Sequence, residues 1–202
     1  MPQNRWAAFL GALILLLAGA GLYFIVSSVA GVYVQTANRA TQTELDRYCE
    51  LIKPLVMFDP PAFDSPAQLE NRTILCASAW LALSRLEHLQ TDELNYTLLP
   101  GAEVRAAAVE LFGPGTRPDL DPLFFGETPR YYNSVSAAYH IPNLPVSGFY
   151  PRLDKAETKG KNVTLTVSYL LLDEEQTGTV PVKQRTYVLT GENGKEIISA
   201  VK

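Results

Sequence analysis

The longest uniform pattern in the chain is an apolar stretch from Trp6 to Val34 that contains no charged side chain. The nearest charges are Arg5 and Arg39, one on each side of the stretch. A helix rises about 1.5 Å per residue, so about 20 apolar residues cross the ~30 Å hydrocarbon core of a bilayer. The stretch is long enough to do this, and it predicts an uncleaved N-terminal membrane anchor.

Two other interpretations of the stretch stay open. A cleaved signal peptide needs a small-x-small site, and Ala18–Ala20 and Ser28–Ala30 both fit locally. A core helix of a globular domain normally carries a polar face, which this stretch lacks. We expect residues 1–34 to form a short tail and a transmembrane signal anchor, and residues 35–40 to form a linker. Residues 41–202 then form one extracytoplasmic domain of a single-pass cell-membrane protein, because long domains cross the membrane largely regardless of flanking charge.

Helical periodicity follows the linker. Thr41 and Glu44 have the spacing of a capping box and predict a helix over residues 41–56. After a proline-rich break, Asp64 or Ser65 begins a second helix that extends to about residue 90. Apolar residues surround most of this second helix, which is typical of a buried helix.

The apolar period changes from 3.6 to 2 in the second half of the chain. A short third helix over residues 104–112 ends at Gly113. Beyond it, alternation of apolar and polar residues predicts strands with one buried face, and Asn193-Gly194 predicts a tight hairpin turn. The three clearest strands are expected at 163–171, 179–190 and 195–201, with weaker ones near 136–141 and 152–158.

Helices followed by antiparallel strands give an α+β order. This order and the closing pattern from Arg185 to Val201, with RTYVLT before NGKEIISAV, resemble the NTF2-like or cystatin-like architecture. That resemblance implies helices packed on a curved antiparallel sheet. The chain also resembles single-pass envelope proteins of bacteria, and in outline the scaffold subunits of bacterial secretion machines, which join a membrane helix to an NTF2-like domain.

The charge balance excludes one class of partner. The chain carries 17 basic and 21 acidic side chains, and only Arg5 precedes Val34. An acidic domain is a poor partner for nucleic acid, because like charges would have to approach one another. The expected partners are therefore membrane lipid, through residues 6–34, and a protein partner or a second copy of the chain.

Cys49 and Cys76 are the only cysteines, and each lies on the apolar side of its predicted helix. If the two helices form an antiparallel hairpin, the cysteines lie at similar heights and a disulfide is possible, as an oxidising exterior would permit. The alternative is a pair of small buried thiols.

The sequence contains no nucleophile-elbow, phosphate-loop, dinucleotide-binding or zinc-protease motif. His140, in a weak strand, is either a structural histidine with a neighbouring partner or the base of an enzyme, a role that Asp121 would also suit. We expect a non-enzymatic domain without a cofactor or a metal.

Aromatic residues gather between the third helix and the strong strands. They line a groove for an apolar ligand or a protein partner, or they cover the core beneath a proline-rich loop. With His140, the candidate groove residues are Phe124, Phe125, Tyr131, Tyr132, Tyr139, Phe149 and Tyr150. The resulting hypothesis is a tethered domain for protein interaction or scaffolding in the cell envelope, with a small-ligand-binding domain or an enzyme of the NTF2-like fold as alternatives.

The anchor can be tested by carbonate extraction of membrane vesicles. We expect the full-length protein to stay with the vesicles, because moving about 20 apolar residues from lipid into water is strongly unfavourable. Immunoblotting and N-terminal sequencing of both fractions give the measurement. Release of a chain that keeps its original N-terminus would show that residues 6–34 do not anchor it.

Overall fold

The computed structural model describes residues 41–85, 90–125, 127–142, 148–172, 179–191 and 195–202, and these have an α+β fold. The predicted anchor, residues 6–34, lies outside the described residues. Among the helices that are described, none has the length and apolarity needed to cross a bilayer.

Helix α2 (Gln42–Phe58) begins at the predicted capping box. The Thr41 hydroxyl accepts the Glu44 N–H at 3.3 Å, while the Thr41 N–H donates to the Glu44 carboxylate at 2.7 Å. These reciprocal bonds satisfy two N–H groups that a helix start would otherwise leave without partners. The helix ends at Asp59, whose φ of 44° lies in the left-handed region and turns the chain away.

The second predicted helix is interrupted, which corrects the sequence-based expectation. Ser65 caps a short 3₁₀ helix, η1 (Pro66–Gln68), and α3 (Asn71–Arg85) begins only after it. Leu69 separates the two in an extended conformation because its side chain turns inward and is buried. The centre of α3 is buried nearly all round, as predicted, and residues 86–89 at its expected end lie outside the described residues.

Helix α4 (Gly101–Phe112) packs against α3, and an Arg85–Glu110 ion pair joins the two helices. Its first residue must be small, because a Cβ at Gly101 would lie 2.7 Å from the Leu120 side chain and 2.8 Å from the ring of Tyr132. The helix ends at Gly113, with φ of 97°, as the sequence predicted.

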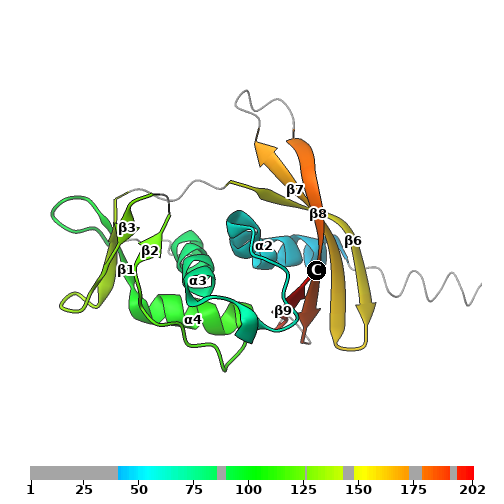
Figure 1. The fold of residues 1–202 in the computed structure, drawn as a ribbon, viewed down its shortest axis with the longest axis horizontal. Helices are drawn as coiled ribbons and strands as arrows, with labels where there is room; N and C mark the ends of the chain where they lie inside the picture. The colour runs from blue at the N-terminus through cyan, green and yellow to red at the C-terminus, as the bar shows by residue number, and fades with distance from the viewer. Residues whose placement is uncertain (1–40, 86–89, 126, 143–147, 173–178, 192–194) are drawn as a thin grey trace, which may run out of the picture. The chain divides into compact units, whose positions relative to one another are not determined.

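A four-stranded antiparallel sheet forms the C-terminal part of the fold (Figure 1). The strands follow one another as a meander in the order β6-β7-β8-β9, and Gly160, with φ of 62°, lies in the turn between the first two. Helix α2 packs on this sheet against β6, and α4 contacts β9. The strands are β6 (Tyr150–Lys159), β7 (Asn162–Leu172), β8 (Thr179–Thr190) and β9 (Ile197–Val201).

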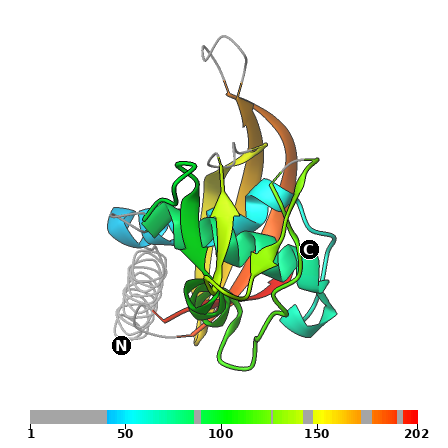
Figure 2. The same cartoon turned by 90° about the vertical axis from the view of Figure 1, so that its left-hand side faces the viewer.

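The strand expected near residues 136–141 does not join this meander, which is a second correction. It becomes β5, the centre of a separate three-stranded sheet of order β1-β5-β4 (Figure 2). Leu99 and Tyr139 lie opposite one another across β1 and β5 and are fully buried, and β1 lies against α3 and α4. The pairing is thus set by burial against the helices. The remaining strands, which periodicity did not predict, are β1 (Thr97–Pro100), β2 (Leu123–Phe124), β3 (Pro129–Arg130) and β4 (Tyr132–Asn133); β5 is Ala138–Ile141.

Two buried tyrosines join strands β7 and β8 inside the core. The hydroxyl oxygens of Tyr169 and Tyr187 lie 2.5 Å apart, and both side chains are fully buried. Burial disfavours the phenolate, so it raises the pKa of Tyr169 to about 12 and that of Tyr187 well above the ordinary value. Burial thus keeps both hydroxyls protonated well above pH 10.

The tyrosine pair predicts a loss of stability at high pH. Unfolded tyrosines ionise near pH 10, whereas Tyr169 holds its proton to about pH 12 in the fold. Between these values the folded state binds more protons, so the free energy of unfolding falls as the pH rises, by roughly 2–3 kcal/mol for this residue. Denaturant titrations across pH 9–12, with tyrosinate absorbance, measure it. Tyr169→Phe should flatten the fall, exposed Tyr131→Phe should not, and equal slopes in all three proteins would contradict the prediction.

Candidate functional site

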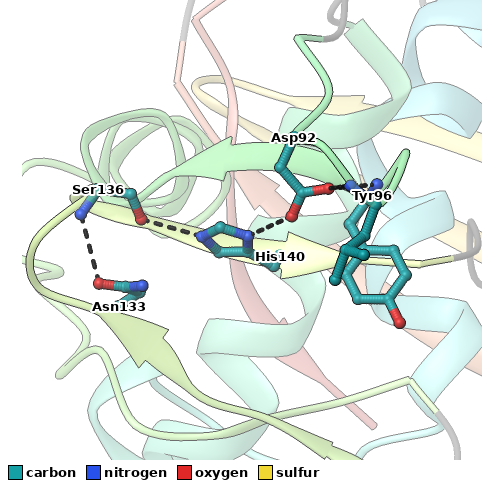
Figure 3. A network of polar contacts seen from close by, with 6 residues as sticks. Asp92, Tyr96, Asn133, Ser136 and His140 are labelled. Carbon is teal, nitrogen blue, oxygen red and sulfur yellow. Dashed lines mark hydrogen bonds and ion pairs between the residues drawn. The ribbon is translucent and has the colours of Figure 1, made fainter.

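Asp92, His140 and Ser136 form a continuous hydrogen-bonded array on the small sheet (Figure 3). Asp92 Oδ2 lies 2.6 Å from His140 Nδ1, and Ser136 Oγ lies 3.0 Å from His140 Nε2. His140 and Asp92 are partly buried, while Ser136 is exposed. We call these three side chains the polar array.

The loop before β1 fixes Asp92. Its Oδ1 accepts the N–H groups of Leu94 at 2.8 Å and Tyr96 at 2.9 Å, a turn that aspartate forms readily. Asn95, with φ of 60°, lets the chain reverse, and Thr91 pairs with Thr97 to close the loop. Because Oδ1 is occupied by these two donors, Oδ2 is the oxygen that meets His140.

The turn between β4 and β5 fixes Ser136 in a similar way. Asn133 Oδ1 accepts the N–H of Val135 at 2.9 Å and that of Ser136 at 3.3 Å. Ala137 has φ of 52°, and its carbonyl accepts the N–H of Gly101 at 3.1 Å, which ties the turn to the start of α4. Both loops of the polar array are therefore held by side chain-to-backbone bonds as well as by strand pairing.

The donor and the acceptor of each hydrogen bond in the polar array can be assigned. An ionised carboxylate only accepts, so Nδ1 of His140 must carry the hydrogen that faces Asp92. In the neutral ring Nε2 is then the acceptor, and the Ser136 hydroxyl donates to it. The hydrogen bond from His140, followed by that from the Tyr96 N–H, holds the pKa of Asp92 below its ordinary value.

Three large apolar side chains on the same loops and strand are exposed to solvent. Leu94 is 70% exposed, Tyr131 69% and Val135 95%. Each lies within two positions of Asp92, Asn133 or Ser136 in the sequence. Polar and apolar groups are thus exposed together on the loops that flank the small sheet.

The predicted aromatic residues do not gather in one groove among the described residues. These residues make several separate contacts, and most of the side chains belong to the core or pack on it. Phe125 stacks on Phe58, Tyr132 packs edge-on against Tyr139, Phe149 packs edge-on against Tyr169, Phe124 lies under the Arg72 guanidinium, Tyr150 is half-buried in β6, and Tyr131 is exposed. Of the set, His140 alone belongs to the polar array.

A cavity of about 540 Å³ lies elsewhere, between η1, the start of α3 and the loop after α4. Its walls include Leu69, Ile74, Phe112, Arg117 and Ile197. None of the aromatic residues that the sequence suggested lines it. The aromatic cluster therefore did not predict this cavity.

Both cysteines are free thiols, so the disulfide considered from the sequence is not formed. The two helices do pack together, but the cysteines meet different neighbours. Cys49 lies beside the backbone of Leu153 in β6, whereas the Cys76 thiol points to the carbonyl of Phe124 at 3.8 Å. Burial raises the pKa of both thiols, which is typical of structural cysteines.

Asp121, the other base that the sequence suggested, belongs to a different set of contacts. Its carboxylate accepts from the side-chain amide of Asn71 at 2.8 Å, and its carbonyl accepts the Tyr139 hydroxyl at 2.8 Å. Neither contact involves the polar array. Within the part of the chain that is described, no cluster of three or more potential metal ligands is found, and His88 lies outside that part.

The sequence did not single out Asp92 or Ser136. The one local signal for Asp92 was the Asp-Glu-Leu-Asn segment, which is typical of a turn in which aspartate binds the following backbone. Ser136 had no comparable signal, because a serine four residues before a histidine is close to it only if the chain reverses between them. The interpretation of His140 as a histidine with a neighbouring partner agrees with the contacts that the structure shows.

The titration of Asp92 tests the polar array directly. The Asp92 pKa should lie below about 3.9, and His140→Ala should raise it, because the histidine hydrogen bond is the largest cause of the shift. A lowered carboxylate pKa means that this stabilisation is present above about pH 4 and is lost as the pH falls further. Carbon NMR of the Asp92 carboxyl measures both values. Ser136→Ala, which does not touch Asp92, is the control, and an unchanged midpoint in His140→Ala would contradict the assignment.

No protein-family model matches this chain, and neither a curated protein nor a solved structure is significantly similar to it.

Proposed function

We propose that the chain is a single-pass membrane protein whose extracytoplasmic domain binds a protein partner through the outer face of the β1-β5-β4 sheet. By the outer face we mean the polar array together with Leu94, Tyr131 and Val135. The charge-free stretch from Trp6 to Val34 supports the tether. The outer face supports the binding role, and the outline resemblance to tethered scaffold subunits is consistent with it.

The observation that carries the proposal is the exposure of three large apolar side chains on restrained loops. Isolated apolar residues at a surface are ordinary, but these three lie within two positions of residues in one hydrogen-bonded network. Binding residues that are already held in place lose less conformational entropy when a partner docks. Apolar anchors surrounded by polar groups are also the usual composition of a protein interface.

The exposed surface of the four-stranded sheet is more polar than the outer face of the small sheet. On the outward side of the four-stranded sheet, Asp154 accepts hydrogen bonds from Ser168, Gln184 and Arg152. The edge strand β6 carries alternating charges and a bulge at residues 153–155, features that discourage pairing with another strand. These surfaces favour contact with water, which leaves the outer face of the small sheet as the better docking surface.

The proposal can be tested by site-specific photo-crosslinking in native membranes. A photoreactive residue at Tyr131 or Val135 should give a discrete crosslinked product, which mass spectrometry identifies as a partner protein or a second copy. The matched control is Val182, an apolar residue of β8 that is 47% exposed. Leu94→Ser should lower the yield from position 135 several-fold, because a partner bound to the outer face would lose one of its three apolar anchors.

Equal yields from positions 135 and 182, or no product from either array loop, would overturn the proposal. Circular dichroism of each variant shows whether the fold is kept. A loss of crosslinking with an intact fold is the result that assigns binding to this face.

A further inference from the structure

We propose that Ser136 is a nucleophile that attacks carboxylic esters, with His140 as its general base and Asp92 as the positioning residue. This goes beyond the proposed partner binding and does not depend on it. It also departs from the non-enzymatic expectation drawn from sequence motifs. It rests on the atoms through which the three side chains meet, on the restraint of their loops and on the exposure of Ser136.

The hydrogen bonds among Ser136, His140 and Asp92 join the atoms that nucleophilic attack by a serine requires. A serine hydroxyl becomes a useful nucleophile when an imidazole nitrogen accepts its proton and a carboxylate holds the other ring nitrogen. Here Ser136 meets Nε2 at 3.0 Å and Asp92 meets Nδ1 at 2.6 Å. The reverse attachment, with serine on Nδ1, would be equally possible in a network that served only to brace two loops.

The Asp92 carboxylate is held in the orientation that positions His140. Two backbone N–H groups occupy Oδ1 of Asp92, so the side chain cannot rotate without losing them. Oδ2 therefore keeps His140 in the tautomer whose Nε2 is free of hydrogen and can accept the serine proton. This restraint lowers the reorganisation that the ring must undergo during the reaction.

The nucleophile is accessible. Ser136 is exposed in the β4–β5 turn, so a substrate can reach its hydroxyl from solvent. Asn133 lies beside it, and its Oδ1 accepts the N–H groups of Val135 and Ser136, which restrains the turn that carries the hydroxyl. Val135, which precedes Ser136 in the chain and is 95% exposed, suits the apolar acyl part of a small ester.

The reaction follows from these positions and needs no further reagent than water. Ser136 Oγ bonds to the ester carbonyl carbon while its proton passes to His140 Nε2. The tetrahedral intermediate then breaks its carbon–oxygen bond, and the departing alcohol takes that proton. Water attacks the acyl-serine, gives a proton to the same nitrogen, and the acid leaves as Ser136 regains its hydrogen.

The test uses the full-length protein with a fluorophosphonate probe and with p-nitrophenyl acetate. Mass spectrometry should place the phosphonyl group on Ser136, and Ser136→Ala should abolish labelling. Ser134→Ala is the matched control, because Ser134 lies in the same turn outside the array, and labelling should be unchanged. His140→Ala should slow both reactions at least 100-fold, and Asp92→Asn at least 10-fold.

Rescue by added imidazole distinguishes a catalytic role of His140 from a purely structural one. Added imidazole should restore a measurable part of the rate in His140→Ala, because it replaces the missing base. Thermal unfolding of each variant identifies those that fail to fold, and the probe is then compared only among folded proteins. Labelling that is absent from the wild-type protein, or that is equal in the wild type, His140→Ala and Asp92→Asn, would overturn the proposal.

Discussion

The need to cover α3 on nearly every side shapes the rest of this fold. Residues Leu75 to Ala79 and Leu81 to Leu83 are all buried, so no single layer can shield the helix. Burying each such apolar side chain contributes about 1.5–3 kcal/mol, and exposing even one side would forfeit several of these contributions. The helix therefore requires neighbours around its circumference, and it packs against α2, α4, β1 and β2.

This requirement explains why the strands divide between two main sheets. The four-stranded sheet packs against α2 and contacts α4 through β9, and the chain supplies β1 and β2 to cover other sides of α3. Strand β5 then pairs with β1, with Leu99 and Tyr139 buried towards the helices. Because alternate residues of a strand face opposite ways, His140 is placed on the outer face together with its partner position, Leu98.

The polar array is thus a consequence of how the core is covered. Loops at the ends of β1 and β5 hold Asp92 and Ser136 by bonds to the backbone, and the β1–β5 pairing brings both to His140. An ordered Asp–His–Ser network combined with exposed apolar residues supports both a docking surface and a nucleophilic site. The two roles are compatible, because a partner that docks beside Ser136 would lie within reach of its hydroxyl.

Local interactions were predictable because neighbouring residues in the sequence settle them. Thr41 and Glu44 cap α2 through atoms only three residues apart, and the predicted inward positions from Val163 to Tyr169 are buried in β7. The alternation breaks at the bulge after Tyr169, where Leu170 is buried and Leu171 is exposed. The break at Leu69 was missed because the burial of one side chain overrode a continuous helical pattern. The short strands β1 to β4 were missed because two to four residues carry too little periodicity to be recognised.

By itself, then, the sequence determined the capped start of α2, the long strands, the α+β order and the presence of a charge-free stretch long enough to span a bilayer. Only the tertiary structure decided which strands share a sheet, that Cys49 and Cys76 stay apart, and that Asp92 meets His140. The last contact joins residues 48 positions apart. Such a contact depends on the pairing of β1 with β5, and that pairing depends on the burial of the whole core rather than on any local pattern.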